Sequence, residues 1–255
     1  MAIIRKVSLF FLGLCAISSC SPKTQKQADL PKHCFGKSVG ASKFIVCKYA
    51  PKESKIALFL KDENKQIIGD FENLREFTKS KGQNLEFAMN GGMYLENRDP
   101  VGLYVENHNE IKSLFKGESI GNFGLKPNGV FYTNENQAGV LETSEYDKAF
   151  KNSKPEFATQ SGPMLVINGN IHPKFIKDSK NLNIRNGVGI DKDGNVFFAI
   201  SKNQVNFYDM AILFKDELKT DNALYLDGTI SKIYSKELGI EETGDNMGPI
   251  IGVIN

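Results

Sequence analysis

The chain has 255 residues, of which 32 are basic and 30 are acidic, so its formal net charge is +2, and 40% of its residues are hydrophobic. This length fits an N-terminal segment and one domain of ~200–250 residues with a real apolar core. The near balance of charge excludes long-range attraction to nucleic acid or to an anionic membrane surface as the basis of function. We therefore expect no nucleic-acid partner.

The N-terminus has the pattern of an export signal. Arg5 and Lys6 precede the apolar stretch 7–17, which has the length of a signal-peptide core and is too short to span a bilayer. The following Ser18-Ser19-Cys20 resembles the end of a bacterial lipobox, whose cysteine becomes the lipidated first residue of the mature protein. We expect residues 1–19 to be a lipoprotein signal peptide and Cys20 to carry the membrane anchor. An ordinary secretory signal is the alternative.

The segment after Cys20 predicts a tether. Removal of residues 1–19 takes away Arg5 and Lys6 and no acidic residue, which leaves 30 basic and 30 acidic residues. Residues 21–32 are polar, as is typical of flexible linkers. We place the tether at residues 20–42 and the folded domain at residues 43–255. The lipid on Cys20 would attach the protein to the cell envelope, and Ser21 after the cysteine would permit export to the outer membrane in a Gram-negative host.

Of the 4 cysteines, Cys15 lies in the expected signal peptide and Cys20 is the expected lipidation site. Cys34 and Cys47 remain, in a compartment that favours oxidation. The two form one disulfide or stay as reduced, buried thiols, since sequence spacing does not fix the distance between their Cα atoms. Both alternatives stay open from the sequence.

Helical and strand patterns follow in the expected domain. Asp70 precedes apolar residues at helical spacing and Gly82 follows them, which predicts a helix between these two positions. Asn206 likewise predicts the start of a helix that runs to Leu218. Lys192-Asp193-Gly194 is a hairpin signal between two apolar runs. We also expect a short helix over 144–150 and strands over 43–49, 55–61, 85–89, 102–106, 123–125, 129–133, 138–142, 164–167, 187–191, 195–201, 223–226 and 249–254.

Strands dominate this pattern, and they do not alternate regularly with helices. The fold class predicted from the sequence is therefore α+β, with mostly antiparallel β-sheets, a few helices and a single domain. The sequence contains no internal repeat and no low-complexity stretch.

Four segments place one polar functional group beside glycine or another small residue. They are Asn90-Gly91-Gly92, Thr159-Gln160-Ser161-Gly162, Arg185-Asn186-Gly187 and Asp227-Gly228, the last with Ser231 shortly after it. Glycine lets the backbone approach a ligand closely. Each segment also has a plain structural explanation, as a turn or as a surface ion-pair partner. Together they favour a site, with Asp227 and Arg185 as catalytic candidates and Asn90, Gly91, Gly92, Thr159, Ser161, Gly162, Gly228 and Ser231 as substrate-binding candidates.

Other chemistries are not indicated. The sequence has no Gly-x-Ser-x-Gly elbow, no His-Glu-x-x-His motif and no Walker loop. Its 3 histidines show no metal-ligand spacing. We expect no cofactor and no metal site, although Asp227 with backbone carbonyls leaves a divalent cation open as an alternative.

Taken in order, the motifs resemble those of the phosphodiester glycosidase family, which includes the lysosomal uncovering enzyme and bacterial envelope proteins related to exopolysaccharide proteins. The resemblance extends from about Phe44 to the C-terminus. One departure is Gly228-Thr229-Ile230-Ser231, where many members have a glycine-rich stretch with two serines. The residues that resemble the family lie in the segments 90–94, 125–132, 159–165, 185–189, 207–211 and 225–231.

The resemblance implies cleavage of a sugar-1-phosphodiester at the anomeric carbon, in an envelope glycan or glycolipid. Arg185 would neutralise the departing phosphate, with Lys126 as a weaker candidate. Asp227 would stabilise the oxocarbenium-like centre, act as nucleophile or activate water. The alternatives are a lipoprotein that binds phosphate-bearing polysaccharide without catalysis, and an interaction lipoprotein that kept the fold and lost activity. An enzyme requires Asp227 and Arg185 to meet in one solvent-reachable hollow.

Overall fold

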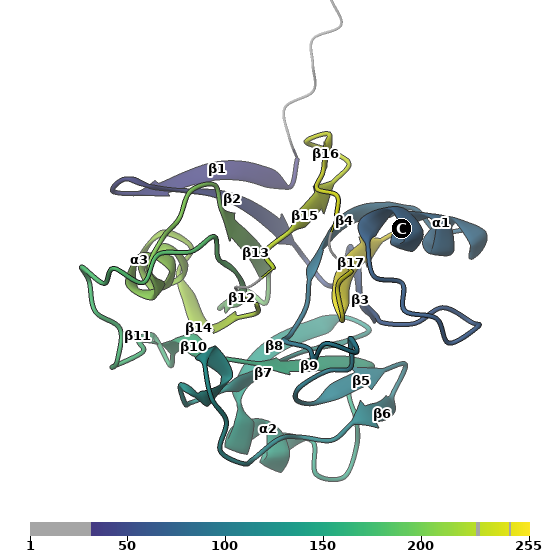
Figure 1. The fold of residues 1–255 in the computed structure, drawn as a ribbon, viewed down its shortest axis with the longest axis horizontal. Coiled ribbons are helices and arrows are strands. Elements are labelled where there is room, and N and C mark those ends of the chain that lie inside the picture. Colours follow the sequence, from purple (N-terminus) through teal and green to yellow (C-terminus); the bar gives the residue numbers. More distant parts are fainter. Residues whose placement is uncertain (1–31, 228–229, 245) are drawn as a thin grey trace, which may run out of the picture. The chain divides into compact units, whose positions relative to one another are not determined.

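The computed structural model describes residues 32–227, 230–244 and 246–255, and these described residues form one compact unit. Cys20 and Gly228 lie outside the described residues. The described strands form one sheet of seven strands and two sheets of five, and every pairing between neighbouring strands is antiparallel (Figure 1). The predicted α+β class with mostly antiparallel sheets is therefore confirmed.

The seven-stranded sheet carries two of the four candidate segments. Its order is β1-β2-β13-β12-β14-β10-β11. Arg185 directly precedes β12, and Asp227 lies just beyond the end of β14. The bounds are β1 Cys34–Val39, β2 Ser42–Tyr49, β10 Met164–Ile167, β11 Asn170–Ile171, β12 Asn186–Asp191, β13 Val196–Ser201 and β14 Thr220–Tyr225.

The two five-stranded sheets carry the other segments. One has the order β16-β15-β4-β17-β3 and the other β6-β5-β9-β7-β8. Asn90 ends β4, and Ser161 ends β9. The bounds are β3 Lys55–Phe59, β4 Leu85–Asn90, β15 Ile233–Ser235, β16 Ile240–Glu241 and β17 Ile250–Ile254, and β5 Tyr104–Glu106, β6 Asn109–Lys112, β7 Gly129–Asn134, β8 Gln137–Glu142 and β9 Phe157–Ser161.

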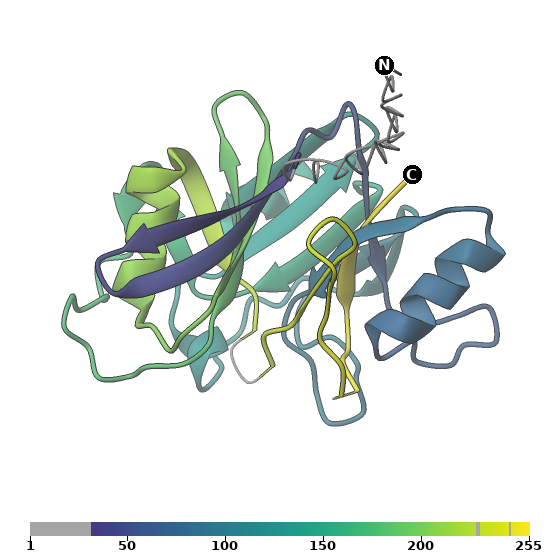
Figure 2. The same cartoon turned by 90° about the horizontal axis from the view of Figure 1, so that it is seen from above.

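The helices begin where the sequence predicts them. The Asp70 carboxylate accepts a hydrogen bond from the backbone N–H of Asn73 at 2.7 Å, and Asn206 does the same for Asp209 at 2.8 Å. Such side-chain caps satisfy backbone donors that a helix start leaves unpaired. Figure 2 shows α1 and α3 on opposite sides of the sheets. The helices are α1 Phe71–Ser80, α2 Thr143–Ala149 and α3 Phe207–Ile212, and α3 continues as a π-helical turn over Leu213–Glu217.

An aromatic core lies where the three sheets face one another. Phe198 of β13 stacks on Phe87 of β4, with their ring centroids 5.1 Å apart, and meets Phe131 of β7 edge-on at 6.0 Å. All three side chains are buried. Burying a phenylalanine contributes roughly 1.5–3 kcal/mol. We call Phe87, Phe131 and Phe198 the aromatic core.

One predicted strand is wrong. Residues 123–125 do not pair in a sheet, because Asn122–Gly124 form a 3₁₀ turn. Gly121 starts this turn with a φ of 64°, and the backbone N–H of Leu125 donates to the carbonyl of Asn122 at 3.1 Å. The apolar Phe123 of this segment is buried without being part of a strand. The short strands β6, β11, β15 and β16 were not predicted, since they lack a sustained alternation.

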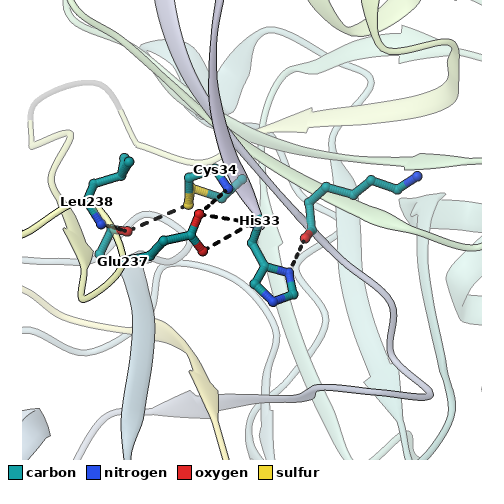
Figure 3. Close-up of a disulfide and its surroundings, with 7 residues drawn as sticks. His33, Cys34, Glu237 and Leu238 are labelled. Carbon is teal, nitrogen blue, oxygen red and sulfur yellow. Dashed lines mark hydrogen bonds between the residues drawn. A yellow bond between two sulfur atoms is a disulfide. The ribbon is translucent and has the colours of Figure 1, made fainter. Parts of the chain in front are cut away.

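The domain begins before residue 43, where the sequence analysis placed the end of the tether. Residues 34–39 form β1, which pairs with β2, and the directly opposed Cys34 and Cys47 form a disulfide. Figure 3 shows the Glu237 carboxylate beside it, accepting hydrogen bonds from the backbone N–H groups of His33 at 3.0 Å and Cys34 at 3.1 Å. The disulfide and this carboxylate therefore fix the start of the domain.

Candidate functional site

Polar side chains at the ends of four strands join the three sheets. The side-chain amide of Asn186, at the start of β12, donates to Asn90 Oδ1, at the end of β4, over 2.7 Å. The Asn186 Oδ1 atom accepts from the backbone N–H of Asp227 at 3.2 Å. The Ser161 hydroxyl, at the end of β9, donates to the carbonyl of Leu226. We call Asn90, Ser161, Asn186 and Asp227 the polar junction.

Strand pairing places these residues together. In the seven-stranded sheet β12 lies beside β14, with Gly187 opposite Tyr225. Asn186, at the start of β12, therefore lies at the same end of the two strands as Asp227, which follows β14. In the neighbouring sheet Asn90 is the last residue of β4 and lies opposite Ile250. All four candidate segments predicted from the sequence therefore meet through direct hydrogen bonds, and the Arg185-Asn186-Gly187 segment takes part through Asn186 rather than through Arg185.

Two buried polar atoms beside the junction have no hydrogen-bond partner within the described parts of the chain: Asn90 Nδ2 and Thr159 Oγ1. The Oδ1 atom of Asn90 is fully used, because it accepts from Asn186 and from the backbone N–H of Lys232 at 2.9 Å. A buried polar group without a partner costs about 1–3 kcal/mol. These two groups are therefore the donors most suited to a polar ligand at this site.

The glycines after Asn90 serve close packing. A Cβ atom on Gly92 would lie 2.5 Å from both Thr159 Oγ1 and the carbonyl oxygen of Gln160. The Gly91 N–H donates to the carbonyl of Pro249 at 2.7 Å, and a Cβ there would lie 3.0 Å from the same oxygen. The chain thus passes directly over Thr159, which places this hydroxyl and Asn90 at one site. Gly162 is similarly enclosed, by the side chain of Asn128.

Asp227 lies at the surface end of the junction, with 8% of its area exposed. The Ser231 hydroxyl lies 2.8 Å from the Asp227 carbonyl oxygen and 3.2 Å from that of Ile184 and can donate to either. The predicted residues Asp227 and Ser231 are therefore neighbours. These contacts hold the backbone of Asp227 at the strand end, on the kind of rigid support that acid–base or nucleophilic chemistry requires.

Arg185 is enclosed by protein, with 0% of its area exposed. Its Nε donates to the carbonyl of Val205 at 2.9 Å and its Nη2 to the carbonyl of Asn181 at 3.0 Å. The guanidinium carbon lies 3.7 Å from the centre of the Phe207 ring. No carboxylate of the described chain lies within 4.0 Å of this cation. Burial lowers the pKa of the guanidinium, and the Tyr225 hydroxyl opposes that shift.

The position of Arg185 changes the expectation for its role. The solvent-reachable hollow that the sequence analysis required for Asp227 and Arg185 does not expose the guanidinium. In this structure the guanidinium is therefore not an open fork for a phosphate.

Tyr225 connects this cation to the junction, and the sequence analysis did not identify it. Arg185 Nη1 donates to the Tyr225 hydroxyl at 3.4 Å. Burial raises the pKa of Tyr225 to about 12, Arg185 opposes that rise, and the negative charge of Asp227 adds to it. The tyrosine thus lies in the field of both predicted catalytic residues. The sequence contains one signal that could have identified Tyr225: it lies two residues before Asp227, and residues two apart on a strand point to the same face of the sheet.

Metal-binding and membrane-spanning features were also sought in the described ranges. No group of three or more histidine, cysteine, aspartate or glutamate side chains there is arranged to hold a metal ion. Within the same ranges, no helix combines the length and apolar character that crossing a membrane requires.

Known proteins resemble this chain in sequence and in structure. The model of the family described as phosphodiester glycosidase matches residues 83–246. The Escherichia coli (strain K12) protein YigE is 41% identical over 187 residues, which cover 73% of this chain and 72% of that protein.

Two solved structures share the fold. The zebrafish N-acetylglucosamine-1-phosphodiester alpha-N-acetylglucosaminidase catalytic domain, auto-inhibited by its pro-peptide, matches with a TM-score of 0.57 at 14% identity, covering 86% of this chain and 81% of that one. A protein from Synechocystis matches with a TM-score of 0.54 at 13% identity, covering 87% of this chain and 61% of the other.

Proposed function

The chain belongs to the phosphodiester glycosidase family, and we propose that it hydrolyses a sugar-1-phosphodiester at the polar junction. The observation that carries this proposal is the pair of buried donors without a partner, Asn90 Nδ2 and Thr159 Oγ1, at the junction where Asn186 links Asn90 to the backbone of Asp227. Hydroxyl and phosphate oxygens of a sugar phosphate are acceptors that such donors would bind.

The reaction breaks the bond between the anomeric carbon and the phosphate oxygen. The phosphate monoester leaves with the electron pair of that bond, the oxygen of water bonds to the anomeric carbon, and a proton of that water is released. A phosphate is a good leaving group, so protonation of its oxygen matters less than in an ordinary glycoside. Asp227 would stabilise the oxocarbenium-like centre, form a covalent intermediate with the anomeric carbon or take the proton from water.

Arg185 and Tyr225 would stabilise the departing phosphate together. Because the pKa of Tyr225 is raised to about 12, its hydroxyl keeps its proton at neutral pH. The hydroxyl oxygen accepts a hydrogen bond from Arg185, which leaves the hydroxyl proton for another acceptor. A buried cation acts in a low dielectric, where its field is stronger than in water. In this proposal the Arg185 charge reaches the substrate through the tyrosine.

The cellular setting is also part of the proposal. Residues 1–20 have the pattern of a lipoprotein signal, so the domain would be exported and held at the cell envelope by lipid on Cys20. A substrate in the envelope, a glycan or a glycolipid that carries a sugar-1-phosphodiester, follows from that location.

The test is hydrolysis by the purified full chain. We expect it to release free sugar and a phosphate monoester from a sugar-1-phosphodiester, measured by phosphorus NMR. A simple alkyl glycoside of the same sugar is the control, and it should stay intact. Binding of the diester without turnover would contradict the proposal and support a lipoprotein that binds phosphate-bearing polysaccharide.

A further inference from the structure

An apolar groove runs beside the polar junction. It has a volume of about 520 Å³, and its lining residues come from β2, β13, β15 and β16 and from the segments that precede β12 and β15. Six isoleucines line it: Ile45, Ile184, Ile200, Ile230, Ile233 and Ile240. We call these residues the isoleucine groove. Solvent-reachable apolar grooves of this kind usually mark binding sites.

The isoleucine groove begins at residues that contact the polar junction. Ser231 lines it, and the hydroxyl of Ser231 lies 2.8 Å from the Asp227 carbonyl oxygen. Lys232 lines it too, and the backbone N–H of Lys232 donates to Asn90 Oδ1. Ile184 directly precedes Arg185 and is 37% exposed. A ligand held at the junction would therefore have one end at the mouth of the groove.

Two lysines, Lys202 and Lys232, and one glutamate, Glu242, also line the groove, so its formal charge is positive, which suits a phosphate. Lys202 belongs to its lining, and no described carboxylate forms an ion pair with this lysine. A phosphodiester has sugar on one side and the esterified alcohol on the other, so a sugar at the junction directs the alcohol away from it. An apolar groove that starts there is suited to an apolar alcohol.

We propose that the isoleucine groove binds the hydrocarbon chain of the alcohol that is esterified to the sugar phosphate, which makes the substrate a glycolipid. This inference rests on the proposed function for the location of the sugar phosphate. The occupant is a single hydrocarbon chain, attached to the phosphate and lying along the isoleucines toward Ile45.

The test measures binding of phosphate monoesters to the full chain by calorimetry, below the concentration at which they form micelles. The probes are methyl, butyl and dodecyl phosphate, with farnesyl phosphate as the isoprenoid counterpart. Each methylene that enters the groove should lower Kd about fourfold, until the groove is full. Comparing dodecyl with farnesyl phosphate distinguishes an unbranched chain from an isoprenoid, and tighter binding of either than of butyl phosphate supports the proposal.

Variants locate the binding. I184E and, as a second variant on another strand, I45E should each lower the affinity for dodecyl phosphate relative to that for methyl phosphate at least tenfold, a ratio in which repulsion of the phosphate itself cancels. The matched control is I176E, in the same 172–184 segment but outside the groove, where Ile176 is 70% exposed. It should bind dodecyl phosphate like the wild type. Thermal unfolding checks that each variant is folded.

Several results would overturn the proposal. Equal affinity for methyl and dodecyl phosphate would exclude a chain-binding groove, and so would chain-length dependence that survives in both I184E and I45E. A dimer that I184E converts to a monomer would assign the groove to a second copy of the chain.

The two proposals fail separately. Chain-length dependence in a protein that hydrolyses no diester would support the groove and defeat the hydrolase. Hydrolysis of a methyl diester, together with phosphate binding that does not depend on chain length, would support the hydrolase and defeat the groove.

Discussion

The aromatic core and the polar junction are built by the same three sheets, and they differ in almost every other respect. Phe87 and Asn90 lie three residues apart on β4. Phe87 stacks on the buried ring of Phe198 of β13, whereas Asn90 accepts a hydrogen bond from Asn186 and keeps one amide donor without a partner among the described residues. The middle of the strand thus serves packing, and its end holds unpaired polar groups.

Within the single strand β4, the residues that stabilise the fold and the residues proposed to act on a substrate therefore occupy different positions. Apolar packing tolerates no polar group without a partner, since each one lowers the free energy of unfolding. A polar junction can carry that cost when a ligand supplies the missing partner. Substitutions in the core should therefore change stability, and substitutions at the junction should change activity.

The largest expected effect is on catalysis. Asp227→Asn keeps the size of the side chain and its backbone contacts but removes the negative charge. We expect sugar release from a sugar-1-phosphodiester to fall by about two to four orders of magnitude. The melting temperature should stay close to that of the wild type. A rate within tenfold of the wild type would remove Asp227 from the proposed chemistry.

In the aromatic core the expectation is reversed. Phe198→Ala removes a buried ring that contacts Phe87 and Phe131, and it should lower the free energy of unfolding by about 3–5 kcal/mol. Denaturant titration measures the loss. The rate per folded molecule should change little, and a rate loss as large as that of Asp227→Asn would contradict the separation between core and junction.

The Cys34–Cys47 disulfide belongs to neither the aromatic core nor the polar junction, so its removal is a control that should change stability and not activity. Replacing both cysteines by alanine removes a crosslink between residues 13 apart. For a loop of this size the expected cost is about 3 kcal/mol of unfolding free energy. Unfolding should occur at lower denaturant concentration, with unchanged sugar release below the transition. If activity disappears while the domain stays folded, the hairpin contributes to the site.

A smaller, mixed effect is expected at the centre of the junction. Asn186→Ala removes the donor to Asn90 Oδ1 and the acceptor of the Asp227 backbone N–H. The unfolding free energy should fall by about 1–3 kcal/mol because buried groups lose partners. Sugar release should fall as well, since Asp227 loses a fixed contact. A stability loss with an unchanged rate would show that the junction serves only to join the sheets.

Local features of the fold were predictable from the sequence, because they depend on neighbouring residues. Asp70 and Asn206 cap helices as predicted, and Gly194 adopts its positive φ in the predicted hairpin. The short strand β15 was not predictable. Its three residues are strand only because they pair with β4, far away along the chain.

The candidate site was predictable in part for the same reason. Strand-end segments with glycine pointed to Asn90, Ser161 and Asp227. Their contacts depend on sheet pairing between residues as far apart as Asn90 and Asn186, which no local pattern specifies. The enclosure of Arg185 by Phe207, Val205 and Asn181 likewise arises from segments that approach only in the folded state. The position of Tyr225 between Arg185 and Asp227 depends on the same long-range contacts.

The most direct test of the central claim follows the oxygen of water. Hydrolysis of a sugar-1-phosphodiester by the full chain in ¹⁸O-labelled water, with mass spectrometry of both products, identifies the bond that breaks. Attack at the anomeric carbon predicts ¹⁸O in the released sugar and none in the phosphate monoester. Label in the phosphate would mean that the phosphorus–oxygen bond is cleaved, and it would contradict a glycosidase at the polar junction.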